Sequence, residues 1–414
     1  MKAETRAMDG AATHPFRWAM LAGVWLIYLC FGLTIAAMAP LVGTVTQELG
    51  ISNSAMGSVL GAWPLVYIFS AIPCGALLDR IGPRLGLLLA ALIMAASGGL
   101  RGLADGHLGL FLATALFGLG GPLISVGAPK VIALWFEGKE RGLAMGIYIT
   151  GPALGGIAAL SLTNSVAMPA FGGDWRLVLL IYAAVVLVSA AVWLGIGAHP
   201  AARAVERDLA AAPRRSQFAV FADLIGLRSV RIMLVMAIGI FFFNHSIGNW
   251  LPEMLRSGGM DARSAGYWAS LSVAAAIVGS LLIPRLAVPS RRLVIMFLLV
   301  LSAGVATLLI LQPPGALLAA GLILQGITRG SMMTIAILIL VETPEVGARN
   351  AGSAGGLFFS AAEIGGVLGP LTVGYISDVT GGFGAALHLL TGICAALMLL
   401  LALLRRQQGL RNAG

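Results

Sequence analysis

Stretches of about twenty residues with little or no charge recur along the whole chain, and they limit the folds open to it. Leu85 to Ala104 and Leu293 to Leu311 are two of them, each as long as an α-helix must be to cross roughly 30 Å of hydrocarbon. Only 10% of the 414 residues are charged and 59% are hydrophobic. That balance excludes an ordinary water-soluble domain, because such domains carry roughly 25% charged residues.

Polar breaks between the apolar runs predict an all-α membrane protein with twelve transmembrane helices in two six-helix bundles. The helices are expected at 17–41, 55–78, 85–104, 109–136, 142–166, 177–198, 231–255, 263–284, 292–311, 316–341, 350–375 and 384–404. The predicted division is a tail at 1–16, a bundle at 17–198, a linker at 199–230, a bundle at 231–404 and a tail at 405–414. The first run is too long for the core of a signal peptide, so we interpret it as a retained helix.

Basic residues are distributed unevenly between the predicted loops. Twenty of the 26 Lys and Arg residues fall on one side if the N-terminus is cytoplasmic, and outside loops hold only Arg101, Arg176, Arg256 and Arg263. Such a bias orients helices in a membrane. We therefore expect a multi-pass protein of a bacterial-type inner membrane with both termini on the cytoplasmic side. The net charge of +9 therefore reflects topology, and a nucleic-acid partner is not expected.

The loop between the second and third predicted helices, Gly75 to Arg84, holds the most specific local motif. Gly75 would let two helices approach closely, and Asp79 would accept hydrogen bonds from the N-terminus of a neighbouring helix. Arg80 and Arg84 would close a cytoplasmic gate through ion pairs, although a basic turn without a gating role is the alternative. The motif resembles the signature loop of the major facilitator superfamily, whose members are secondary transporters.

The fifth predicted helix contains a cluster of glycine and proline, namely Gly151, Pro152, Gly155 and Gly156. The cluster is similar to a motif of proton-linked antiporters in that superfamily, with Gly146 one place off the pattern. Close helix packing at the glycines explains the cluster equally well. A comparable group recurs in the eleventh predicted helix at Gly365, Gly366, Gly369 and Pro370, as a repeat of the two halves predicts.

Two opposite charges are predicted near the middle of the membrane, where an unpaired charge costs several kcal/mol. Arg329 would hold a carboxylate or a similar oxyanion through two parallel hydrogen bonds, and Gln325 is assigned to the same site. Glu363 would carry a proton. The alternative is a structural ion pair between Arg329 and Glu363, and an anion that displaces Glu363 from that pair would couple transport to protonation.

Other polar residues of the predicted helices complete the candidate site. Lys130 would line an inward exit path for an anion or extend to the lipid headgroups. His245 would bind substrate, carry a proton or serve only in packing. Asn244 and Asn249 are expected to line a cavity, because amides that faced lipid would lack hydrogen bonds.

Arg101 is predicted to be a solvated helix end or to attract anions. Aromatic residues with polar groups are assigned to the walls of the same cavity. The aromatic candidates for substrate contact are Tyr28, Trp63 and Tyr148.

Further motifs narrow the function. The sequence shows no paired zinc ligands, no phosphate-binding loop and no set of catalytic residues, so neither an enzyme, nor a cofactor, nor ATP-driven transport is expected. Trp135 to Gly146 and Trp250 to Pro252 resemble anion-transporting branches: cyanate and nitroimidazole permeases, anion:cation symporters, oxalate:formate exchangers and monocarboxylate transporters. The resemblance implies a monomer that carries a small anion with protons or by exchange. A proton-linked efflux antiporter for drugs is the alternative.

Overall fold

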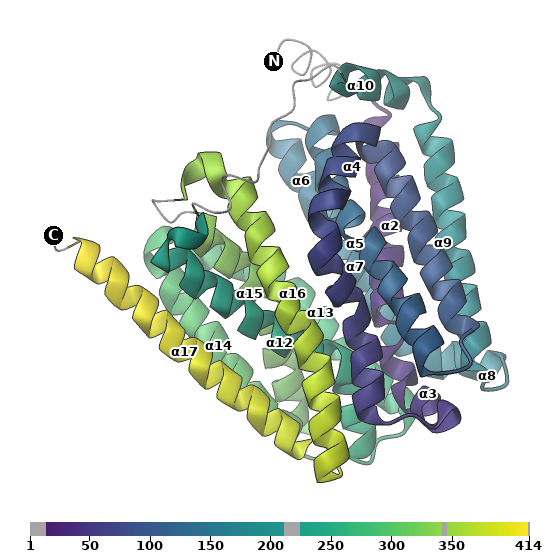
Figure 1. The fold of residues 1–414 in the computed structure, drawn as a ribbon, viewed down its shortest axis with the longest axis vertical. Coiled ribbons are helices and arrows are strands. Elements are labelled where there is room, and N and C mark those ends of the chain that lie inside the picture. The colour runs from purple at the N-terminus through teal and green to yellow at the C-terminus, as the bar shows by residue number, and fades with distance from the viewer. Residues whose placement is uncertain (1–13, 211–223, 342–345, 413–414) are drawn as a thin grey trace. The chain divides into compact units, whose positions relative to one another are not determined.

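The computed structural model describes residues 14–210, 224–341 and 346–412, and regular structure in them is helical throughout. Contacts divide the chain into two compact units, one within Met1–Leu41 and Leu65–Arg215 and the other within Val42–Pro64 and Ser216–Gly414. The helices up to residue 210 are α2 (Arg17–Ala36), η1 (Ala39–Leu41), α3 (Val42–Leu49), α4 (Asn53–Gly102), α5 (His107–Trp135), α6 (Gly138–Tyr148), α7 (Thr150–Leu162), η2 (Thr163–Ala167), α8 (Met168–Ala170), α9 (Trp175–Gly197) and α10 (Pro200–Ala210) (Figure 1).

The second half repeats this arrangement of long helices. Its helices are α12 (Arg228–Ser257), α13 (Ala262–Leu286), η3 (Pro289–Arg291), α14 (Arg292–Ile310), α15 (Ala316–Val341), α16 (Gly347–Thr380) and α17 (Gly384–Asn412). The observed bounds agree with most of the predicted spans, and α15 has the predicted limits.

Helix α4 contains two membrane crossings. Its 50 residues would extend about 75 Å at 1.5 Å per residue, more than twice the thickness of the hydrocarbon core. Gly82 interrupts the helix with φ 79° and ψ 159°, a conformation that only glycine adopts readily. Eleven helical stretches of the described chain are long and apolar enough to span a bilayer, and α4, which is one of the eleven, contains two crossings. The prediction of twelve transmembrane helices is therefore confirmed.

Glycines allow the backbones of paired helices to touch within each unit. In the first unit, a Cβ at Gly155 of α7 would overlap the Leu29 carbonyl of α2, and one at Gly151 would lie 3.0 Å from the Leu29 nitrogen. In the second unit, a Cβ at Gly365 of α16 would overlap the Ile238 carbonyl of α12. These contacts place α2 beside α7 and α12 beside α16 (Figure 1). The rest of the predicted cluster lies at the same place, since Gly156 is buried and the Pro152 carbonyl meets Gly32 of α2.

Three aspartates cap helices of the described chain, and a carboxylate there accepts hydrogen bonds that the first turn of a helix leaves unused. Asp174 accepts from the Arg176 and Leu177 nitrogens that begin α9. Asp261 caps α13, and the hydrogen bonds from Ser264 lower the pKa of its exposed carboxyl. Asp378 of α16 caps α4 by accepting from the Asn53 and Ser54 nitrogens at 2.9 and 2.7 Å. The start of α4 is thereby fixed to the second unit.

The structure differs from the predicted division at the linker and at the C-terminal tail. Part of the predicted linker is helical, as α10, because Ala202 and Val205 are buried on one face. Helix α17 continues past residue 404 to Asn412, which includes most of the predicted tail. The predicted N-terminal tail up to residue 13, linker residues 211–223 and residues 413–414 lie outside the described residues.

Replacing Gly82 by Ala is expected to destabilise the protein by about 1–3 kcal/mol, because a Cβ is strained at φ 79°. The measurement is the midpoint of thermal unfolding of the purified protein in detergent. Gly142→Ala is the matched control, because that helical glycine has open space around its Cβ position and alanine favours a helix. Equal midpoints for the two variants would show that the bend in α4 does not require glycine.

Candidate functional site

Arg329 of α15 lies against Gly248 of α12, in the second unit. A Cβ built at Gly248 would be 2.5 Å from the Nη2 atom of Arg329, so glycine provides the space that the guanidinium occupies. The arginine side chain is partly exposed, and among the described residues it forms neither a hydrogen bond nor an ion pair. An unpaired guanidinium near the middle of a membrane-spanning helix is able to bind an anion.

Glu363 of α16 faces His245 of α12. The distance between Glu363 Oε2 and His245 Nε2 is 3.8 Å, and the glutamate side chain is only 5% exposed. The absence of a side chain at Gly366 makes room for both groups, because a Cβ there would be 2.5 Å from Glu363 Oε2. The alternative of a structural ion pair between Arg329 and Glu363 is wrong for the described residues, since Glu363 points to the histidine instead.

The imidazole of His245 lies near two aromatic side chains. Its ring centroid lies 5.4 Å from that of Trp63 in α4 and 5.5 Å from that of Phe241 in α12. Trp63 belongs to the second unit with the histidine and is buried. The structure therefore brings the candidates Trp63, His245 and Glu363 together, with the aromatic rings limiting how far the imidazole can turn.

The three predicted amides have different surroundings. Asn249 is partly exposed and its Nδ2 donates to the His245 carbonyl at 2.8 Å. Asn244 is also partly exposed, but its Oδ1 is buried and has no partner among the described atoms. Gln325 is fully buried, where its Oε1 accepts a hydrogen bond from Ser272 of α13. Its burial in the contact between α13 and α15 does not support the predicted contact of Gln325 with substrate.

The first unit contains the other aromatic candidates. The rings of Tyr28 and Tyr148 lie 5.2 Å apart, and both side chains are buried. Arg101 is also buried there, at 2% exposure, where it donates to the Thr34 carbonyl and lies 5.6 Å from the Phe117 ring. The expectation of a solvated helix end at Arg101 is wrong, because the carbonyl and the aromatic ring replace water around the charge.

The loop motif forms contacts within the first unit that the sequence did not predict. Asp79 accepts from Lys130 of α5 at 2.8 Å, whereas we expected the carboxylate to meet a helix N-terminus and the lysine to line an exit path or reach headgroups. Arg84 donates to the Gly197 carbonyl at the end of α9. Arg80 is exposed. A Cβ at Gly75 would meet nothing within 4 Å, so the predicted close approach of helices at this glycine is not found.

The sequence did not indicate Gly248 or Phe241, and it indicated Gly366 only as part of a glycine cluster; all three surround the charged residues of the second unit. One signal was present for the first of them. His245, Gly248 and Asn249 are spaced i, i+3 and i+4, so they share a face of α12 if that segment is helical. Phe241 had no such signal, and the place of Gly366 beside Glu363 and His245 depends on which helices pack together.

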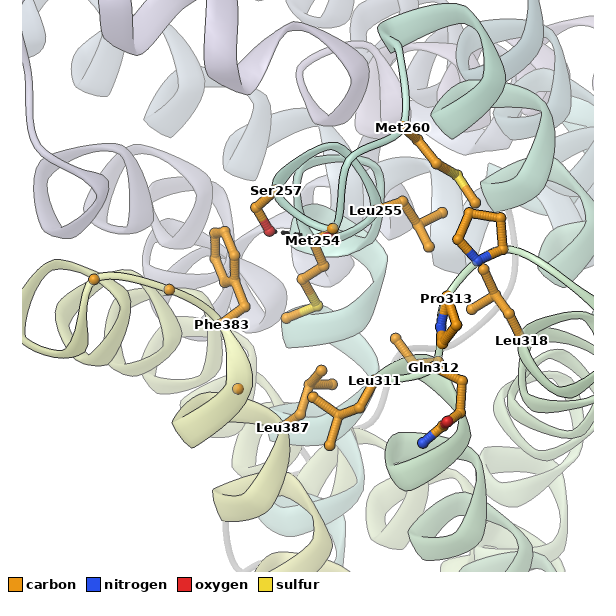
Figure 2. Close-up of a pocket in the computed structure, with 16 residues that line it drawn as sticks. Met254, Leu255, Ser257, Met260, Leu311, Gln312, Pro313, Leu318, Phe383 and Leu387 are labelled. Atoms are coloured by element: carbon orange, nitrogen blue, oxygen red, sulfur yellow. Dashed lines mark hydrogen bonds between the residues drawn. The ribbon is translucent and has the colours of Figure 1, made fainter.

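A cavity of about 420 Å³ lies elsewhere in the second unit (Figure 2). It is formed by the C-terminal end of α12, the N-terminal ends of α15 and α17, and the connections before α13, α15 and α17. Figure 2 shows Met254, Leu311, Phe383 and Leu387 among the side chains around it. None of the described residues that line the cavity is charged, so it is a poor candidate for binding an anion.

Comparisons with known proteins give consistent matches over most of the chain. A family model described as Major Facilitator Superfamily matches residues 24–316 and 233–413. An uncharacterised transporter of Bacillus subtilis, YycB, is 29% identical over 86% of each chain. A probable galactarate/D-glucarate transporter of Escherichia coli, GudP, is 24% identical over 91% of this chain and 92% of its own. The crystal structure of the nucleoside transporter NupG superposes with a TM-score of 0.77 at 14% identity, covering 94% of this chain and 99% of that one, and so shares the fold.

Replacing Gly248 by Ala is expected to weaken anion binding by roughly 10-fold, because the new methyl group displaces a guanidinium whose charged hydrogen bonds contribute about 1.5–3 kcal/mol each. The measurement is the carboxylate concentration that gives half-maximal thermal stabilisation. Gly239→Ala is the control on the same helix, because its Cβ would meet only the flexible end of Leu397. Equal effects of the two variants would separate Gly248 from the anion site.

Proposed function

Because the chain belongs to the Major Facilitator Superfamily, which confirms the resemblance of its loop motif, we propose that it transports a small organic acid anion by alternating access. The protein is a multi-pass membrane transporter and not an enzyme. In the proposed mechanism, Arg329 holds the carboxylate of the substrate, and Asn244 and Asn249 contact the rest of it. Tyr28, Tyr148 and Trp63 are further proposed contacts.

The observation that carries this proposal is the unpaired state of Arg329. A buried arginine normally has its donors satisfied, as Arg101 partly does through a backbone carbonyl and an aromatic ring. Arg329 instead forms no hydrogen bond with the described residues and remains partly exposed. A carboxylate would bind this guanidinium through two parallel hydrogen bonds, which an ammonium or a neutral amphipath could not form.

The names of relatives support an organic acid as the substrate. GudP is named for galactarate and D-glucarate, and other matched transporters of Escherichia coli and Bacillus subtilis are named for hexuronate. All of these compounds carry carboxylates. We therefore favour a carboxylate over cyanate or nitrate as the cargo of this chain.

We propose proton coupling through Glu363 and His245. A carboxylate buried at 5% exposure is costly unless it is protonated or paired with a protonated imidazole, and both arrangements contain one proton. The Trp63 and Phe241 rings near His245 support this proposal, because they would restrict rotation of the imidazole away from Glu363. Glu363 does not pair with Arg329, so the substrate would not displace the glutamate. The negative charge of the bound anion would instead raise the proton affinity of Glu363 and His245.

A proton-linked efflux antiporter for drugs is the second candidate, and one observation favours it. Glu363 has no ion pair with Arg329, and membrane-embedded acids of this kind are suited to binding cations. The unpaired positive charge of Arg329 opposes it, since a cationic drug would be repelled there. Efflux therefore stays the alternative, and the Arg329→Gln experiment distinguishes it from anion transport.

We propose that both termini face the cytoplasm, that the membrane is a bacterial inner membrane and that the transporter works as a monomer. Arg80, Arg84 and Asp79 are proposed to act at the cytoplasmic gate, with the ion pair between Asp79 and Lys130 holding the loop to α5. Either a proton would move together with the substrate, or a counter-anion would be exchanged for it.

Replacing Arg329 by Gln is expected to weaken carboxylate binding by roughly 10- to 100-fold, which corresponds to the loss of charged hydrogen bonds of about 1.5–3 kcal/mol. Purified protein is titrated with a panel of small carboxylates and cationic drugs, and the thermal midpoint is measured for each. Uptake of the stabilising acids into proteoliposomes follows.

Arg263→Gln is the matched control, because that arginine is exposed at the start of α13. Carboxylate affinity and uptake that remain normal in Arg329→Gln would contradict the proposed site. Stabilisation by cationic drugs alone, unchanged in the variant, would support efflux instead.

Replacing Glu363 by Gln is expected to abolish substrate-driven proton movement while exchange of substrate for substrate continues, because glutamine cannot bind the coupled proton. A pH-sensitive dye trapped in proteoliposomes reports proton entry after substrate addition. Asp105→Asn, which neutralises an exposed carboxylate between α4 and α5, should leave proton entry unchanged. Normal proton entry in Glu363→Gln would exclude Glu363 as the coupling residue.

A further inference from the structure

We infer that Asn249 selects acids that carry a hydroxyl group close to the carboxylate, an inference that rests on the proposed anion site at Arg329. Asn249 would be a specificity-determining residue, since it would contact the hydroxyl group of the substrate, whereas Arg329 would contact only the carboxylate. The preferred cargo would then be a hydroxy acid rather than a plain monocarboxylate or an inorganic anion.

The orientation of the Asn249 amide follows from its hydrogen bond. Its side chain contacts the His245 carbonyl oxygen at 2.8 Å, and a carbonyl only accepts, so the contacting atom must be Nδ2. The other amide atom, Oδ1, is therefore an acceptor. Within the described chain Oδ1 receives no hydrogen bond, and it is not among the buried atoms that lack a partner. The oxygen is consequently accessible and free to accept a hydrogen bond from a bound molecule.

Helix geometry places this acceptor beside the proposed carboxylate site. His245, Gly248 and Asn249 lie at i, i+3 and i+4 and share one face of α12. The Arg329 guanidinium occupies the space above Gly248, where a Cβ would be 2.5 Å from Nη2 and 3.0 Å from the guanidinium carbon. A five-donor cation and a single acceptor are thus presented by neighbouring positions of one surface.

The two groups differ in what they can bind. Arg329 only donates, so a carboxylate, nitrate or cyanate can each accept a hydrogen bond from it. Asn249 Oδ1 only accepts, and none of those anions has a hydrogen to offer. A hydroxyl on the carbon next to the carboxylate supplies that donor. A site with such an acceptor discriminates against the analogue that lacks the hydroxyl, because binding the analogue leaves the acceptor without a partner.

The test uses pairs of acids that differ only in one hydroxyl: lactate with propionate, and glycolate with acetate. Dissociation constants are measured by thermal stabilisation of the purified full chain in detergent. In the wild type we expect the hydroxy acid of each pair to bind about 10-fold more tightly, the factor that corresponds to a hydrogen bond of about 1.4 kcal/mol. In Asn249→Ala, we expect the ratio of the two dissociation constants in each pair to fall to nearly one. Only lactate and glycolate should bind more weakly, while propionate and acetate should bind as before.

Two further variants separate this inference from the proposed function. Arg329→Gln is expected to weaken both members of each pair, because it removes the carboxylate contact that they share. Gln312→Ala, which removes an exposed amide far along the chain from α12, is expected to change neither member. Asn249→Ser is the second variant at the site if the alanine protein does not fold, since serine also bonds to the carbonyl four residues earlier in a helix.

Each outcome has a distinct meaning. Failure of all four acids to stabilise the wild type would contradict the anion site itself. Equal binding of lactate and propionate to the wild type would overturn the hydroxyl inference and leave Arg329 in place. A preference for lactate that survives in both Asn249→Ala and Asn249→Ser would assign the recognition to another residue and also overturn the inference.

Discussion

Backbone contact between helices at glycine is the interaction on which each unit depends. Lipid is as apolar as the side chains, so helices in a membrane gain little from the hydrophobic effect when they associate. Close packing replaces it, and it requires positions without a Cβ. Gly155 against α2 and Gly365 against α12 hold equivalent helix pairs in the two units. Gly326 and Gly330 likewise bring α15 onto α13 at the Ser272 and Ala276 carbonyls.

The charged residues of the second unit take their positions from these contacts. Packing of α16 on α12 brings Glu363 opposite His245. Packing of α15 on α13 at Gly326 and Gly330 fixes the part of α15 that carries Arg329. Gly366 and Gly248 then provide the space that the two charged side chains fill. The same residue type therefore fastens the helices and accommodates the groups that we propose to bind substrate and proton.

Two arginines within the membrane-spanning helices have different surroundings for the same charge. Arg101 is enclosed, with a carbonyl and an aromatic ring beside it, and its role is to join helices of the first unit. Arg329 is partly exposed and lacks a protein partner in the described chain. The sequence placed Arg101 at a helix end and Arg329 near the middle of a span, but only the surroundings in the structure distinguish a structural arginine from one that is available to a ligand.

The sequence by itself determined the twelve crossings, because the length of an apolar run and the thickness of a bilayer decide whether a helix spans. It also singled out Arg329, Glu363 and His245, since a charged or titratable group inside such a run is rare and costly. Only the tertiary structure decided their partners: Glu363 with His245 rather than Arg329, Asp79 with Lys130, and Gln325 with Ser272. The physical reason is that each of these pairs joins different helices, and the faces that helices present to one another depend on packing over the whole unit, which no local pattern of residues records.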